Sequence, residues 1–197
     1  MKAQDLVNKC KDIATNYKTL YVYGCFGAPL NAKNKQRYTH NYAYNEQPAR
    51  TKKILAASAD TFGFDCVNLI KGILWGWNGN VNATYGGAVY ASNGVPDTSA
   101  NGMFQNCCYD KSNNFSNVQP GELVWMDGHI GVAITNKLAV ECTPIWKDGV
   151  QITAMNCNVA GYNRRNWTSH GKCKFVDYSA APKPEPTPTP DPTPITL

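Results

Sequence analysis

The sequence lacks any long apolar run. Its 197 residues contain no stretch approaching the ~18 apolar residues that a membrane-spanning helix needs, so an integral membrane protein is not expected. Charged residues are also scarce, at 17%, and no basic run is longer than two residues, as at Lys52-Lys53. The formal charge of +5 therefore does not indicate a nucleic-acid partner, and it suits either another polyanion or simple solubility.

The sequence also lacks cysteines and histidines at the spacing that metal sites use. There is no Cys-x-x-Cys motif and the three histidines are isolated, so neither a metal nor another cofactor is expected. The eight cysteines are an even number, which would suit disulfides in a secreted chain. The first residues, however, are amphipathic and lack the apolar core of a signal peptide. This predicts synthesis in a reducing cytoplasm, with most cysteines serving as small buried hydrophobic residues.

The aromatic and apolar content, 11% and 43%, is enough for one packed α+β domain, which we expect to be monomeric. We place this domain over residues 1–179. From Pro182 to Pro194 every second residue is proline, which excludes a helix and predicts an extended spacer. Because spacers connect modules, we expect residues 180–197 to be a linker that leads to a second module absent from this sequence.

Apolar periodicity predicts the elements of the domain. Helices are expected over residues 4–17, 49–57 and 65–77, and a short extended segment over 20–24. After the Pro120-Gly121 turn, consecutive antiparallel strands are expected over 122–126, 129–134 and 138–143. Two further strands are expected over 149–153 and 174–178, and residues 78–118 are expected to be mostly loop.

Cys66 is the first candidate for chemistry. It begins the apolar helix directly after Asp65, where a thiol is near free backbone N–H groups and the positive end of the helix dipole. Both effects favour the nucleophilic thiolate, and the same N–H groups could hold an oxyanion. A plain core cysteine is the alternative interpretation.

A thiol nucleophile needs a base, and the base needs an orienting group. His129 opens a predicted strand, where it could point toward a packed helix. If the next hairpin loop has three residues, Gly131 pairs with Glu141, and His129 and Glu141 become diagonal neighbours on one face, about 7–8 Å apart. The Glu141 carboxylate would then accept the Nδ1 proton of His129. A two-residue loop would put Glu141 on the other face, and a surface carboxylate is the alternative.

Together these residues resemble the NlpC-type cell-wall peptidases, which are papain-like peptidoglycan hydrolases related to CHAP amidases and endopeptidases. The resemblance covers about residues 20–145. Its motifs are, in order, Leu20-Tyr21-Val22-Tyr23-Gly24, Gly63-Phe64-Asp65-Cys66, Gln119-Pro120-Gly121-Glu122-Leu123-Val124-Trp125 and Gly128-His129-Ile130-Gly131-Val132-Ala133-Ile134. The interval from His129 to Glu141 also matches the family's interval to its third catalytic residue.

The resemblance implies a papain-like α+β fold, with the nucleophile at the N-terminus of a central helix packed on a small antiparallel sheet. It implies Cys66 as nucleophile, His129 as general base and then acid, and Glu141 as the residue that orients the imidazole. Tyr21 and Asp65 fall on positions that line the pocket and help to bind substrate.

The chain departs from the family at three places. One is Glu141, a carboxylate as in some CHAP enzymes, where the NlpC type usually has His, Asn or Gln. Val67-Asn68 stands where the family commonly has Ser-Gly, and residues 31–60 form an insertion that we expect to reshape the substrate groove.

We therefore expect a cysteine peptidase or amidase that cleaves an amide bond in bacterial peptidoglycan. The missing signal peptide and the spacer suggest a phage or prophage endolysin, made in the cytoplasm and acting on the cell wall after lysis. The candidate bonds are the muramoyl–L-alanine amide, the D-glutamyl–diamino acid bond and the cross-bridge.

Two other functions stay open. One is a non-catalytic wall-binding module on the same fold, which would use an aromatic groove. That groove would contain Tyr21, Tyr23, Trp75, Trp77 and Trp125. The other is a disulfide-stabilised structural domain of a secreted protein.

Overall fold

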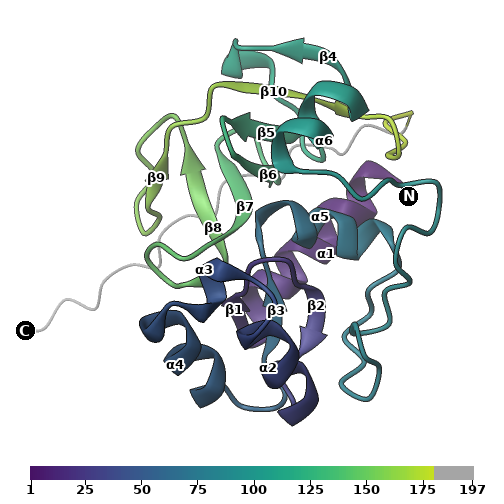
Figure 1. Ribbon diagram of the computed structural model, residues 1–197. Helices are drawn as coiled ribbons and strands as arrows, with labels where there is room; N and C mark the ends of the chain where they lie inside the picture. The colour runs from purple at the N-terminus through teal and green to yellow at the C-terminus, as the bar shows by residue number, and fades with distance from the viewer. Residues whose placement is uncertain (180–197) are drawn as a thin grey trace, which may run out of the picture.

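The computed structural model describes residues 1–179, so the proline-rich linker expected over 180–197 lies outside the described residues. Residues 1–179 form a mixed α+β fold with two sheets (Figure 1). No helix within this range has both the length and the apolar character to cross a membrane.

The described helices are α1 (Ala3–Asn16), α2 (Ala32–Thr39), α3 (Ala43–Glu46), α4 (Pro48–Ala56), α5 (Cys66–Leu74) and α6 (Ala100–Cys107), with a 3-10 turn at Phe115–Asn117. The strands are β1 (Thr19–Tyr21), β2 (Phe26–Pro29), β3 (Phe62–Phe64), β4 (Cys108–Ser112), β5 (Leu123–Met126), β6 (His129–Ala133), β7 (Leu138–Thr143), β8 (Gly149–Met155), β9 (Arg164–Arg165) and β10 (Ser169–Cys173).

The larger sheet has the strand order β4-β10-β5-β6-β7-β8-β9. All neighbouring strands are antiparallel except β8 and β9, which are parallel. Helix α5 packs on β6 and β7, and α1 packs on β8. The central helix therefore does lie on a sheet, but this sheet is larger than the small antiparallel one we expected, and it is mixed.

The smaller sheet has the order β1-β3-β2, and its central strand leads directly into α5. The three helices of the 31–60 segment gather beside it, at the end of the molecule away from β4 and β10 (Figure 1). The start of α5 consequently lies between the small sheet with its helices and the large sheet.

Several expected elements are confirmed within a few residues, namely α1, α4, α5 and the strands β5 to β8. The strand expected over 174–178 is wrong. Those residues turn, with the Val176 N–H donating to the Cys173 carbonyl, and the strand is β10, just before them. Its His170 and Gly171 have little intrinsic strand preference, and β10 forms because it pairs with both β4 and β5.

The loop expected over 78–118 contains α6 and β4. Ser99 begins α6 by accepting the N–H of Gly102, and the helix buries Met103 and Phe104. An eight-residue helix is too short to show a clear apolar period, so the sequence did not reveal it.

Gly27 provides a test of the packing of β2 against Trp77, which follows the end of α5. Its φ is +101°, and an added Cβ would overlap the indole ring of Trp77, whose Nε1 donates to the Gly27 carbonyl at 2.9 Å. Gly27→Ala should lower the free energy of unfolding by about 1–2 kcal/mol because of the left-handed backbone. Overpacking against the indole ring should lower it by about 1–3 kcal/mol more. Gly94→Ala is the matched control, because Gly94 has φ +70° and open space around it. Urea unfolding that gives equal losses for the two variants would contradict this packing.

Candidate functional site

Asp65 fixes the start of α5. Its backbone is extended, and its carboxylate accepts the N–H of Asn68 at 2.8 Å, as an N-cap residue does. The second carboxylate oxygen accepts the N–H of Gly24 at 2.8 Å and the side-chain amide of Asn68 at 2.6 Å. Cys66 is therefore the first residue of a rigidly capped helix, as the sequence predicted.

The thiol of Cys66 is buried, with 9% of the residue exposed. Burial and then the Asp65 carboxylate raise the pKa of Cys66 to about 12, while the backbone N–H groups of Val67 and Ile130 act in the opposite direction. The expected preference for thiolate is thus wrong for the resting protein, because burial and a neighbouring negative charge outweigh the helix start. The N–H of Ile130 also places the sulfur beside the first residues of β6.

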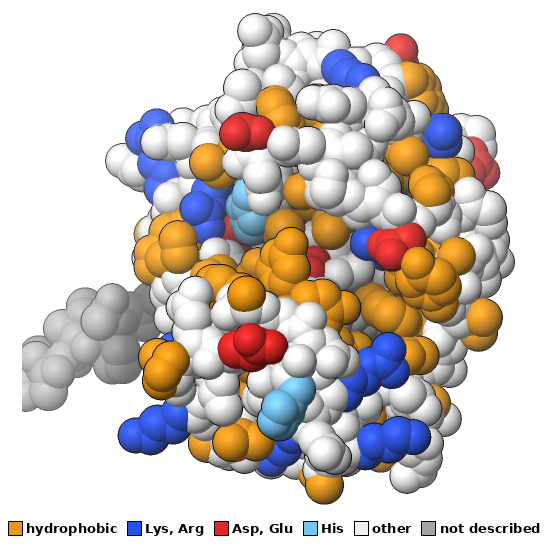
Figure 2. Space-filling view, viewed as in Figure 1, with side chains coloured by type: hydrophobic (Ala, Val, Ile, Leu, Met, Phe, Trp, Pro, Cys, Tyr) orange, Lys and Arg blue, Asp and Glu red, His pale blue; other side chains and the backbone are white. Residues whose placement is uncertain are grey.

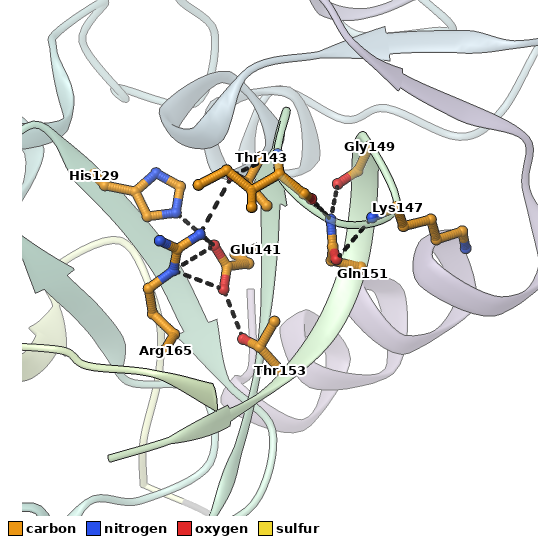
Figure 3. A network of polar contacts seen from close by, with 9 residues as sticks. His129, Glu141, Thr143, Lys147, Gly149, Gln151, Thr153 and Arg165 are labelled. Carbon is orange, nitrogen blue, oxygen red and sulfur yellow. Dashed lines mark hydrogen bonds and ion pairs between the residues drawn. The ribbon is translucent and has the colours of Figure 1, made fainter. Parts of the chain in front are cut away.

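The register of the β6–β7 hairpin is the predicted one. Gly131 lies opposite Glu141, and the Ile134 N–H donates to the Leu138 carbonyl at 2.8 Å, which leaves a three-residue loop. His129 and Glu141 are therefore on the same face, and His129 Nε2 lies 2.6 Å from Glu141 Oε2 (Figure 3). The proximity that we inferred from strand parity is confirmed.

The nitrogen that bonds to Glu141 differs from the expected one. We expected Nδ1, whereas the structure uses Nε2. A neutral imidazole that donates from Nε2 carries its lone pair on Nδ1. Nδ1 makes no hydrogen bond to any group in residues 1–179, so it is the ring atom available to accept a proton.

Glu141 is fully buried, which rules out the surface carboxylate that we kept as an alternative. Thr153 Oγ1 donates to Oε1 at 2.7 Å, and Arg165 Nη2 donates to Oε2 at 2.8 Å. Figure 3 shows His129, Thr153 and Arg165 converging on this carboxylate. Burial alone would raise the pKa of Glu141, but the hydrogen bonds and charges of His129 and Arg165 outweigh it and hold the pKa below its ordinary value.

Sequence reasoning missed Thr153 and Arg165. Thr153 could have been found, because Glu141 pairs with Gln151 and Thr153 is then its diagonal neighbour on the same face. No spacing signal identifies Arg165, which arrives on the short strand β9 by tertiary folding.

The imidazole is stacked on Trp167, with ring centroids 5.3 Å apart and planes 6° apart. Gly131 makes room for the Trp167 ring, which a Cβ at Gly131 would contact. Ala133 and Trp167 belong to one core cluster, whereas Ile130 belongs to the cluster beneath α5. By strand alternation, His129 has the parity of Ala133 and faces away from α5.

Cys66 and His129 thus approach the beginning of β6 from different sides. The thiol meets the backbone of Ile130, and the imidazole belongs to the preceding residue. No hydrogen bond joins the two side chains within the described part of the chain.

A pocket of about 950 Å³ opens at the start of α5. It is lined by Cys66, Asp65 and Tyr21, so the structure brings these three predicted residues together. Burial, followed by the nearby Cys66 and Asp65, raises the pKa of Tyr21, which keeps its hydroxyl protonated. His129 and Glu141 are not part of the lining, although Gly128 is.

Seven of the residues that line the pocket are aromatic, and most of the others are polar or small. Figure 2 shows hydrophobic side chains gathered across the middle of this face, where the surface is hollowed. The 31–60 segment contributes Arg37, Tyr38 and Tyr42 to the lining. The aromatic groove considered from the sequence is only partly present, because Trp75 and Trp77 are core residues and Trp125 stacks on Phe104.

No family model matches the chain, and no curated protein matches it significantly. Residues 1–179 contain no group of three or more His, Cys, Asp or Glu side chains that could hold a metal ion. All eight cysteines are free and six of them are buried.

The raised pKa of Cys66 makes its alkylation strongly pH-dependent. Below the pKa of a thiol, the thiolate fraction rises about tenfold per pH unit, so modification of Cys66 by iodoacetamide should accelerate by about that factor per unit from roughly pH 7 to 9. Peptide mapping by mass spectrometry would isolate Cys66 from the other seven thiols. A rate that is already level below about pH 8 would show instead that a cation lowers the pKa.

Proposed function

We propose that this chain is a thiol-dependent hydrolase that cleaves an amide bond in bacterial peptidoglycan. The observation that carries the proposal is the hydrogen bond between His129 and the buried Glu141. It forms in the predicted strand register and leaves Nδ1 without a partner in residues 1–179. The thiol of Cys66, at the capped start of α5, lies beside the first residues of the same strand, β6.

In the proposed reaction, His129 Nδ1 takes the proton of Cys66 while Sγ attacks the carbonyl carbon of the scissile amide. Because the pKa of the thiol is raised, the proton leaves during attack and no thiolate forms beforehand. The backbone N–H of Cys66 and the protonated Tyr21 hydroxyl are the groups that can stabilise the tetrahedral oxyanion.

The imidazolium that results is stabilised by the Glu141 carboxylate and returns its proton to the leaving amine as the C–N bond breaks. Water, deprotonated by His129, then attacks the thioester, and the C–S bond breaks to restore the thiol. Arg165 and Thr153 hold the two Glu141 oxygens, so they position the carboxylate without touching the substrate.

Peptidoglycan is proposed as the substrate because the motifs of the chain, in their order, resemble those of the NlpC-type peptidases. An aromatic pocket of this size suits several residues of a stem peptide. The alternative is a wall-binding module without turnover. One observation favours it, namely that Cys66 and His129 are not hydrogen-bonded to each other within residues 1–179.

Loss of activity in Cys66→Ala separates the two functions. The variant should release no new amines from purified peptidoglycan, while its melting curve changes little, since such a small truncation costs about 1 kcal/mol. Cys142→Ala is the matched control, because Cys142 is a buried thiol nearby that does not line the pocket. Equal turnover by wild type and Cys66→Ala would remove Cys66 as the nucleophile, and no turnover by wild type would favour the binding module.

Glu141 should act by orienting and stabilising the imidazolium. Glu141→Gln keeps an acceptor but removes the charge, so it should retain part of kcat, whereas Glu141→Ala should lose roughly tenfold more. Rates are compared per folded molecule, because both changes leave Arg165 without its carboxylate. Glu122→Gln is the control, since Glu122 forms the other buried His–Glu pair, with His170 at 2.5 Å. Full activity in Glu141→Ala would end this assignment.

A further inference from the structure

We infer that Arg37 is the residue that binds a carboxylate of the substrate in the pocket that contains Cys66. This inference rests on the proposed function and goes beyond it, because it selects an acidic peptide as the substrate class. Arg37 belongs to α2 of the 31–60 segment, which the resemblance to cell-wall peptidases does not explain.

Aromatic residues hold the Arg37 guanidinium in place. Nη1 donates to the Tyr85 hydroxyl at 2.6 Å, and the guanidinium carbon lies 5.3 Å from the Tyr85 ring centroid and 5.8 Å from that of Tyr38. Cation–π contacts of this kind orient an arginine without neutralising its charge. The group is therefore preorganised while its remaining N–H donors are available to a ligand.

Arg37 differs from the two arginines that support the structure. Arg50 pairs with Asp148 at 2.7 Å, and Arg165 pairs with Glu141 at 2.8 Å. Arg37 forms no ion pair with any carboxylate in residues 1–179, although two acidic residues line the same pocket. Its charge faces solvent and is open to a ligand.

The two acidic residues of the pocket are already engaged. Asp97 is held by Lys71, which is buried, and by the Tyr90 hydroxyl at 2.8 Å. Burial alone would raise the pKa of Asp97, but the hydrogen bonds of Lys71 and Tyr90 outweigh it and lower the pKa. Asp65 caps α5. With Asp97 matched by Lys71, Arg37 is the lining cation whose charge is not balanced by a partner.

A carboxylate fits this position better than other groups. An arginine can donate two parallel N–H groups to the two oxygens of a carboxylate. The Tyr85 hydroxyl accepts from Arg37, so its own proton can be given to the same ligand. A peptide with its scissile amide at Cys66 and a free carboxylate on a neighbouring residue would use both ends of the pocket.

Binding to Cys66→Ala tests this inference without turnover. The probes are a synthetic acidic stem tetrapeptide and the same peptide with its carboxylates converted to carboxamides, and titration calorimetry gives the two dissociation constants. Adding Arg37→Gln should weaken binding of the acidic peptide by about 10–100-fold and leave the carboxamide peptide nearly unchanged. Arg37→Lys should recover part of the loss, because it keeps the charge without the fork of donors.

Lys33→Gln is the control, since Lys33 is an exposed cation on the same helix that does not line the pocket. It should leave both dissociation constants unchanged. Equal weakening of both peptides by Arg37→Gln, or no weakening, overturns the inference. If the wild type cleaves the acidic peptide and Arg37→Gln does not affect its binding, only the carboxylate site fails. If the acidic peptide binds through Arg37 but the wild type cleaves neither peptide, the hydrolase proposal fails and the carboxylate site stands.

Discussion

The buried carboxylate of Glu141 constrains this part of the molecule more than any other group. Burying an ionised carboxylate costs several kcal/mol unless its oxygens are paired and hydrogen-bonded. Here the partners come from three different strands, with His129 on β6, Thr153 on β8 and Arg165 on β9. A shift of one residue in the register of any of these strands would remove a partner, and the buried carboxylate would then lack one of its hydrogen bonds. The His129 orientation is therefore fixed by the same contacts that fix the sheet.

The pKa of the Cys66 thiol depends on two opposing effects. The first turn of α5 offers N–H groups that favour negative charge, yet the residue that caps this turn is itself a carboxylate. Asp65 gives the helix a rigid start and at the same time raises the pKa of Cys66. A neutral, buried thiol resists oxidation and alkylation better than a free thiolate. Its reactivity then depends on a base, which connects the chemistry of Cys66 to the position of His129.

Local patterns in the sequence predicted the parts of the site that lie within one hairpin. A loop of three residues and strict alternation were enough to bring His129 and Glu141 together, and a capped apolar run was enough to begin a helix at Cys66. Contacts made by distant segments could not be predicted in this way. Trp167, on which the imidazole is stacked, and Arg165, which pairs with Glu141, reach the site through the pairing of β8 with β9. The prediction that Nδ1 of His129 bonds to Glu141 was also wrong, because strand alternation defines the face on which a side chain lies and not its rotamer.

The charges around the pocket would give an acidic peptide, the substrate that we propose, a preferred direction. An anionic group beside Cys66 would meet the Asp65 carboxylate in a buried setting, where like charges repel strongly. The same group near Arg37 would meet an unbalanced cation between two tyrosines. An acidic peptide that filled the pocket would therefore have its uncharged amide, and not its carboxylate, next to the thiol. The buried Asp65 carboxylate that raises the pKa of the thiol is thus the same group that would keep a substrate carboxylate away and leave the scissile amide beside Cys66.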